Sequence, residues 1–236
     1  MNNSERSVLV VGGTGFIGGN LLRKLISRGF QTTAIGFAER RQPERLSLVD
    51  GLNVLPAASS KLADLRASLS GHRFDFIINL TSGGVHPADR TPANLQESNA
   101  AFLVRLLEAV ADLPPQLVIH AGSWSEYAQP IDKLPVNENH PLQYGPGYGG
   151  AKALAERDGS ACAARLGIAF VTLRLFHIYG PGEPEHRLMP YLISNMSTGH
   201  AADLTPGDQV RDFLFVDDVC DAFMAILSLK NSIAEG

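Results

Sequence analysis

The chain has few of the residues that build disulfide frameworks, metal sites or nucleic-acid surfaces. Its only cysteines, Cys162 and Cys220, are too few and too far apart for a disulfide framework or a metal site. Both fall in helical patterns, which predicts that they are small core side chains. The formal net charge of −4 provides no basic surface, so nucleic acid is not an expected partner, and neither is an anionic membrane. No metal ion is expected either.

Long apolar runs are missing as well. No stretch reaches the roughly 18 apolar residues of a membrane span. The polar start, MNNSERS, has no apolar segment of the kind found in a secretory signal. We therefore expect a cytoplasmic protein. The hydrophobic content of 44% and charged content of 19% are typical of a globular chain that can bury a large core.

The strongest positive signal is the stretch SVLVVGGTGFIGGN, at residues 7–20. An apolar, β-branched run leads into the spacing Gly12-x-x-Gly15-x-x-Gly18, and a helical pattern begins at Phe16. In a strand–turn–helix unit, such glycines permit a tight turn, a close approach of the backbone to a pyrophosphate, and close helix–strand packing. The helix N-terminus then favours the phosphate charge. The stretch predicts dinucleotide binding by Gly12, Gly15, Phe16, Ile17 and Gly18, with a purely structural turn as the alternative.

Strand and helix patterns alternate along the rest of the chain. Strands are predicted at 31–35, 52–55, 74–80, 117–121 and 168–176, and helices at 16–28, 61–69, 94–111, 148–166, 188–196 and from about 216 to 230. This alternation predicts an α/β fold with a Rossmann-type, doubly wound parallel sheet. Ligands of such a sheet bind at the carboxyl ends of its strands. We therefore expect the small-residue loop Thr81-Ser82-Gly83-Gly84 to pass under the cofactor, with Leu80, Thr81 and Ser82 as cofactor contacts.

The second predicted strand lacks an acidic residue at its end, Gly36-Phe37. NAD enzymes of this kind usually place an Asp or Glu there to hold the ribose hydroxyls. Arg40 and Arg41 follow instead, and two guanidinium groups near the ribose suit a 2′-phosphate. The sequence thus predicts NADP(H) in preference to NAD(H). A solvated, charged loop is the alternative interpretation.

Tyr148 and Lys152 stand four residues apart at the start of a predicted helix, so their side chains share one face. An ammonium beside a phenol favours the phenolate, and such a tyrosine can exchange a proton with a sugar or alcohol oxygen. Ser123, at the end of the fifth predicted strand, is placed to hydrogen-bond the same oxygen. We therefore predict that Ser123, Tyr148 and Lys152 form a catalytic set.

With these motifs the chain resembles an extended short-chain dehydrogenase/reductase of the nucleotide-sugar epimerase/dehydratase group. The resemblance rests on GGTGFIGG (12–19), Ser123 with Tyr127, Tyr148-x-x-x-Lys152, LRLFHIYGPG (173–182) and RDFLFVDDV (211–219). It implies that Lys152 also holds the nicotinamide ribose and that the segment Phe176-His177-Ile178 lines the nicotinamide pocket. It further implies that Arg211 meets the pyrophosphate of a nucleotide sugar. A homodimer is also expected.

Several departures from the family's pattern narrow these expectations. Trp124-Ser125 replaces the Asp-Glu pair that dehydratases carry after the catalytic residue, so dehydration loses its acid and base. Ala57-Ala58 stands where an acidic residue usually approaches the adenine, and His177 stands where epimerases often have Asn. His177 stays open between a ligand contact and a structural role, whereas for Arg174 we favour a strand-end ion pair.

The domain organisation is expected to follow the family, with one difference. Members generally continue into a substrate-binding lobe, whereas this chain stops at Gly236. We therefore expect a dinucleotide-binding Rossmann domain over 1–176. A small, apparently truncated substrate-binding region over 177–236 would be interleaved with the last sheet elements.

The expected function is that of an NAD(P)-dependent oxidoreductase acting on a nucleotide-linked sugar. The motifs most resemble keto-deoxysugar reductases with CDP- or dTDP-linked substrates. Substrate contacts are expected from Ser123, Trp124, His177 and Arg211. The first alternative is a nucleotide-sugar 4-epimerase with tightly bound NAD. The second is a non-catalytic dinucleotide-binding protein built on the same fold.

Overall fold

A computed structural model describes residues 6–38, 46, 49–84, 90–128 and 135–233. Six parallel strands form its main sheet, in the order β3-β2-β1-β4-β5-β6. This is the strand order of a doubly wound, dinucleotide-binding fold, and it confirms the predicted fold class. The strands are β1 (Ser7–Val11), β2 (Gln31–Phe37), β3 (Asn53–Ala57), β4 (Phe76–Asn79), β5 (Leu117–Ser123) and β6 (Ala169–Leu175).

The two faces of this sheet carry separate apolar clusters. Val8 and Val10 of β1 belong to one cluster, and Leu9 and Val11 belong to the other. Successive residues of a strand point to opposite faces of the sheet. All four side chains are fully buried, so both faces are covered here. A sheet covered on both faces needs strands that are apolar throughout, which is why β1 reads as an uninterrupted apolar run.

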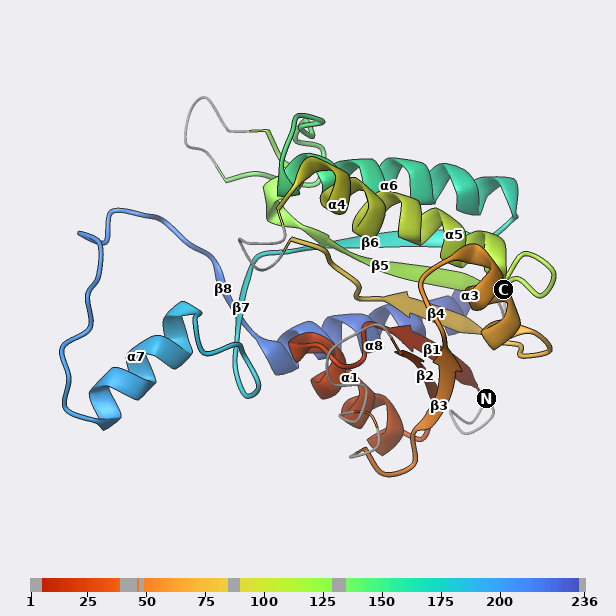
Figure 1. The fold of residues 1–236 in the computed structure, drawn as a ribbon, viewed down its shortest axis with the longest axis horizontal. Coiled ribbons are helices and arrows are strands. Elements are labelled where there is room, and N and C mark those ends of the chain that lie inside the picture. The colour runs from red at the N-terminus through yellow and green to blue at the C-terminus, as the bar shows by residue number, and fades with distance from the viewer. Residues whose placement is uncertain (1–5, 39–45, 47–48, 85–89, 129–134, 234–236) are drawn as a thin grey trace.

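Helices cover both faces of the sheet (Figure 1). One cluster packs under α1 (Phe16–Ser27) and α8 (Val216–Ile233). The other packs under α3 (Leu62–Leu69), α5 (Phe102–Ala109) and α6 (Tyr148–Arg165). Cys162 and Cys220 are buried, one in each cluster, which confirms that they are core side chains. The last helix of the chain therefore packs on the same sheet as the first.

The helix predicted over 94–111 consists of three consecutive segments. They are α4 (Pro92–Gln96), a π-helical turn (Glu97–Ala101) and α5. Thr91 caps the start by accepting the N–H of Asn94 at 3.3 Å. The π-helical turn carries Asn99, whose buried amide bonds both the N–H (3.3 Å) and the carbonyl (3.2 Å) of Gly83. π-helical turns are frequent at functional sites, and this one supports the loop that follows β4.

The sequence did not predict a second sheet of two parallel strands, β7 (His177–Tyr179) and β8 (Phe213–Phe215). This sheet brings the segments HIYGPG and RDFLFVDDV together. Between its strands lie α7 (Leu188–Ser197), none of whose residues is buried, and residues 200–212, which form no helix or strand. Figure 1 shows this part of the chain projecting from the layered body. Among the described helices, none has the length and apolarity that a membrane crossing requires.

Candidate functional site

The carboxyl ends of β1, β4 and β5 meet at a cavity of about 700 Å³. β1 and β4 are neighbours in the sheet whose following connections run in opposite directions, and doubly wound folds bind their ligands at such a point. Most of the predicted site residues line this cavity, namely Gly12, Gly15, Phe16, Ile17, Gly18, Leu80, Thr81, Ser82, Ser123, Trp124, Tyr148, Lys152, Phe176, His177 and Ile178.

One predicted site residue in the described part of the chain, Arg211, does not line the cavity. Arg211 is exposed, and its Nη1 donates to the carbonyl of Val210 at 2.9 Å. Arg40 and Arg41 lie outside the described residues. The wall includes two cations that the sequence analysis missed, Arg90 and Arg187. No motif surrounds either arginine, so the sequence alone gave no signal for them.

The turn between β1 and α1 is shaped by glycine at two points. Gly12 has φ of +95°, in a region that favours glycine, and its carbonyl accepts the N–H of Gly15 at 3.1 Å. At Gly18, a Cβ atom would overlap that same carbonyl oxygen. The first turn of α1 has no acidic residue, and no side chain caps it. Its N–H groups and positive dipole end are therefore available to a pyrophosphate in the cavity.

Tyr148 and Lys152 reach the cavity from the first turns of α6, as their spacing predicts. Lys152 is 1% exposed, and its Nζ donates to the carbonyls of Ala121 (3.0 Å) and Thr81 (3.2 Å). The Tyr148 hydroxyl bonds the Ser82 hydroxyl at 2.9 Å. An ammonium has three donors, so the two bonds to carbonyls leave one for a ligand oxygen. Lys152 thus joins the end of β5 to the loop after β4.

Ser123 ends β5 and is held by the short 3₁₀ turn that follows, Trp124–Glu126. Its Oγ lies 2.8 Å from the Ser125 hydroxyl and accepts the Ser125 N–H at 3.3 Å. Its own N–H donates to Oε1 of Glu126 at 2.5 Å. This reciprocal arrangement is a capping box. The sequence analysis considered Ser125 only as a departure from the dehydratase pattern. It missed Glu126, although the spacing Ser123-x-x-Glu126 is the signature of that motif.

Beyond Ser123, one wall of the cavity is aromatic. The Trp124 ring lies 5.2 Å from the ring of His177 and 6.4 Å from that of Phe176, centre to centre. Burial lowers the pKa of His177, and the positive charges of Arg211 and Arg187 lower it further. The imidazole is therefore neutral at neutral pH. Its Nδ1 is buried and finds no hydrogen-bond partner within the described part of the chain.

Arg174 of β6 forms the ion pair that we favoured for it. Its Nε donates to Oε2 of Glu156 on α6 at 3.0 Å, and its Nη2 pairs with Oε1 of the same carboxylate. Its Nη1 donates to the Tyr127 hydroxyl at 3.2 Å. This bidentate pair joins β6 to the helix that carries Tyr148 and Lys152. Across the described ranges, no group of three or more His, Cys, Asp or Glu side chains could hold a metal ion.

Two curated proteins illustrate what the chain is similar to. It is 28% identical to dTDP-6-deoxy-L-talose 4-dehydrogenase (NAD(P)(+)) of Kitasatospora kifunensis, in a match that covers 92% of this chain and 68% of that protein. It is 26% identical to CDP-abequose synthase of Salmonella typhimurium, covering 96% of this chain and 71% of that protein. The match thus spans about 70% of each relative's length.

Solved structures share the fold of this chain, and a family model identifies its family. UDP-glucose 4-epimerase of Thermotoga maritima, crystallised with UDP-glucose, superposes with a TM-score of 0.80 at 24% identity, covering 92% of this chain and 71% of that one. The model of the NAD dependent epimerase/dehydratase family matches residues 8–236. That match takes in nearly every element around the cavity, and the chain belongs to the NAD dependent epimerase/dehydratase family.

Proposed function

We propose that this enzyme is an NAD(P)-dependent oxidoreductase that reduces a keto-deoxysugar linked to CDP or dTDP. One observation carries the proposal: a single cavity brings the glycine turn of α1 together with Ser123, Tyr148 and Lys152. A dinucleotide and a hydroxyl-bearing substrate would therefore meet at these side chains. The two relatives support a deoxysugar, because one is a 4-dehydrogenase of a dTDP-linked deoxysugar and the other a CDP-abequose synthase.

The cofactor would lie along the glycine turn and over the end of β4. Gly12, Gly15 and Gly18 would hold its pyrophosphate at the N-terminus of α1, with Phe16, Ile17, Leu80, Thr81 and Ser82 beside it. Lys152 would donate its remaining N–H to the nicotinamide ribose, and the segment Phe176–Ile178 would border the nicotinamide. When bound, the nicotinamide supplies the hydride that reduces the sugar carbonyl.

The proton would come from Tyr148. Its hydroxyl, which bonds Ser82 in the structure, would turn to the substrate oxygen and protonate it as negative charge develops there. Ser123, whose hydroxyl bonds Ser125, would donate a second hydrogen bond to the same oxygen. Two donors aimed at a developing alkoxide stabilise the transition state more than the ketone. Hydrogen bonds of this kind often reach their final partners only in the substrate complex.

The sugar would pack against Trp124 and His177. Trp124 is 38% exposed and borders Ser123, so its ring offers an apolar surface beside the reacting oxygen. A sugar carbon that has lost its hydroxyl suits such a surface. Trp124 and Ser125 provide no carboxyl group, which argues against the elimination of water. We assign 1–176 to dinucleotide binding and 177–236 to part of the substrate region, in which Arg187 and Arg211 would attract the pyrophosphate.

The test is the fate of the cofactor. We expect the purified protein to release little bound nucleotide on denaturation and to consume NADPH stoichiometrically with a CDP- or dTDP-linked 4-keto-6-deoxysugar. A thermal-shift screen of UDP, dTDP, CDP and GDP sugars would select the substrate to assay. Tightly retained NAD, with interconversion of two sugar nucleotides and no net cofactor change, would instead identify the 4-epimerase. Binding of cofactor without any turnover would identify a non-catalytic protein.

A second prediction concerns the choice of cofactor. Ile35 and Phe37, at the end of β2, line the cavity without a carboxylate, so a 2′-phosphate meets no repulsion from them. Charge-assisted hydrogen bonds from Arg40 and Arg41 would contribute roughly 1.5–3 kcal/mol, or about one to two decades in affinity. We expect a lower Kd for NADPH than for NADH, and loss of that difference in Arg40→Ala/Arg41→Ala. Equal affinities in the wild type would contradict the prediction, as would a preference that survives the double substitution.

A further inference from the structure

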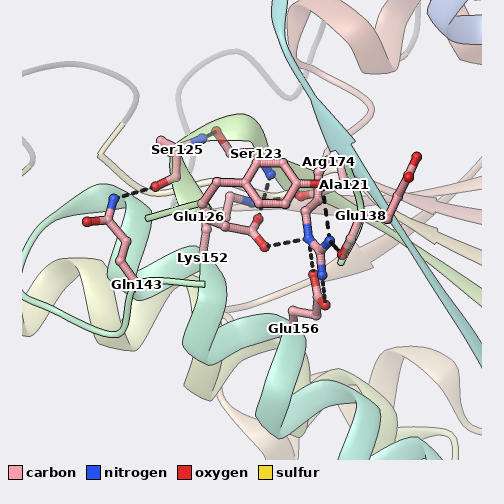
Figure 2. A network of polar contacts seen from close by, with 10 residues as sticks. Ala121, Ser123, Ser125, Glu126, Glu138, Gln143, Lys152, Glu156 and Arg174 are labelled. Carbon is pink, nitrogen blue, oxygen red and sulfur yellow. Dashed lines mark hydrogen bonds and ion pairs between the residues drawn. The ribbon is translucent and has the colours of Figure 1, made fainter. Parts of the chain in front are cut away.

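A buried carboxyl group lies directly beneath Ser123. Glu126 is fully buried, and Figure 2 shows its side chain between Ser123, Arg174 and the α6 residues Lys152 and Glu156. It takes no part in the hydride and proton transfers proposed above. A buried acidic side chain is costly unless it is paired or neutral, so its place under Ser123 needs an explanation.

The two oxygens of Glu126 have different surroundings. Oε1 accepts the Ser123 N–H at 2.5 Å. Oε2 is buried without a hydrogen-bond partner in the described part of the chain, and it lies 3.6 Å from Nε of Arg174. Arg174 directs its own donors elsewhere, to both oxygens of Glu156 and to the Tyr127 hydroxyl. The guanidinium therefore forms a bidentate pair with Glu156 and leaves Glu126 a single, longer contact (Figure 2).

This arrangement favours a proton on Glu126. The close donors of Arg174 are taken by Glu156, so an ionised Glu126 would be left, fully buried, with only the 3.6 Å contact of its Oε2 to the guanidinium. Burial raises the pKa of Glu126 to about 8; the Ser123 N–H opposes this rise, the Glu156 carboxylate adds to it, and the Lys152 ammonium opposes it. The charged and titratable groups around Glu126 are thus Glu156 and Lys152 of α6 and Arg174 of β6, with Tyr127 beyond Arg174. At neutral pH the carboxyl group is mostly uncharged.

We propose that Glu126 is a positioning residue for Ser123, acting as a neutral acid whose carbonyl oxygen fixes the Ser123 backbone. A neutral acid holds the Ser123 backbone in place without adding negative charge beneath the oxygen on which an alkoxide forms. An ionised carboxylate there would oppose that developing charge. The catalytic consequence rests on the proposed function, whereas the hydrogen bond and the buried proton do not.

The hydrogen bond is tested by amide exchange at Ser123, which requires no turnover. Glu126→Leu removes the acceptor at similar volume, and Glu126→Gln restores an uncharged one. We expect the Ser123 amide to exchange about tenfold faster or more in Glu126→Leu, as for loss of a buried hydrogen bond, and to return toward the wild-type rate in Glu126→Gln. Asp158→Asn, which changes an exposed carboxylate on α6 paired with Arg157, is the matched control. Equal Ser123 exchange in wild type and Glu126→Leu would overturn the proposal.

The buried proton is tested by the pH dependence of unfolding. A pKa of about 8 in the folded protein, against 4.5 as the ordinary value, means that the native state binds the extra proton between these pH values. The stabilisation is therefore full below the lower value and is lost as pH rises to the upper one. Relative to Glu126→Gln, the wild-type folding equilibrium constant should fall by up to about tenfold per pH unit in that window. If the free energy of unfolding depended on pH in the same way in the wild type and in Glu126→Gln, the neutral-acid assignment would be overturned.

Turnover then tests the catalytic consequence. In Glu126→Leu we expect kcat to fall while the Kd for NADPH stays unchanged, and Glu126→Gln should restore kcat and weaken the alkaline decline of the wild type near pH 8. Wild-type kcat in Glu126→Leu would overturn the positioning role and leave the proposed function intact. If the wild type turns over no nucleotide sugar, the proposed function fails. In that case the hydrogen bond to Ser123 and the buried proton of Glu126 are still decided by the exchange and unfolding experiments.

Discussion

Tyr148→Phe should lower kcat by roughly 10²–10⁴-fold, the usual contribution of a positioned general acid, while the Kd for the cofactor stays unchanged. The substitution removes only the hydroxyl, which bonds Ser82 at 2.9 Å at the edge of the cavity. The ring keeps its volume, and Lys152 keeps its bonds to the carbonyls of Thr81 and Ala121. Single-turnover reduction with NADPH prebound would isolate the chemical step from substrate binding.

Tyr144→Phe provides the matched control for this experiment. Tyr144 is 52% exposed, and its ring packs under the guanidinium of Arg157 rather than in the cavity. Its hydroxyl can be removed without changing the site, so its kcat should equal that of the wild type. Unchanged turnover in Tyr148→Phe would show that another group supplies the proton. If Tyr148→Phe instead weakened cofactor binding as strongly as it lowered turnover, Tyr148 would serve binding rather than proton transfer.

The sheet was predictable because its strands follow a simple physical rule. A strand buried on both faces must be apolar throughout, and β1 and β4 are short apolar runs bounded by turn residues. Helix periodicity then placed α1 and α6 close to their observed ends, within one or two residues. The carboxyl ends of parallel strands lie at one edge of the sheet. The meeting of Gly12 and Ser123 at that edge therefore followed from the predicted parallel sheet. Tyr148 begins α6 and was assigned to the site from the Tyr148-x-x-x-Lys152 motif instead.

The pairing of β7 with β8 was not predictable from local patterns. His177–Tyr179 and Phe213–Phe215 pair across more than thirty residues of chain, and neither is long enough to show a period. The π-helical turn was missed for a related reason, since the residues Glu97–Ala101 continue an apolar helical pattern. Such features depend on tertiary packing, which overrides local propensity.

The side-chain network under Ser123 also depends on tertiary contacts that local sequence patterns do not show. The spacing of Ser123 and Glu126 could have suggested a capping box, but no local pattern shows that the carboxyl group would be fully buried. Its burial arises because β6 brings Arg174 alongside and α6 brings Glu156. For the same reason, the sequence could not show that Arg187, and not Arg211, would line the cavity. Loop paths decide which way those side chains face.

Gly18→Ala should weaken the binding of NADPH and NADH alike. A Cβ at this position would overlap the carbonyl oxygen of Gly12 and lie 2.7 Å from Cα of Gly13. Because these are backbone atoms, α1 must shift away from the turn that holds the pyrophosphate. Overpacking of this kind costs roughly 1–3 kcal/mol, so we expect Kd to rise by about one to two decades. Cofactor titration by calorimetry measures the change, and urea unfolding reports any loss of stability.

Gly19→Ala separates this steric effect from the general effect of alanine in a helix. A Cβ at Gly19 would meet only Nη1 of Arg23 at 3.8 Å and the carbonyl of Gly13 at 3.9 Å, which are ordinary contacts. Replacing a helical glycine by alanine without strain stabilises a protein by about 0.4–1 kcal/mol. Gly19→Ala should therefore unfold at higher urea concentration and bind cofactor as the wild type does. If Gly18→Ala behaved in the same way, the cofactor could not depend on close approach of α1 to the Gly12 turn, and the phosphate would have to be held elsewhere in the cavity.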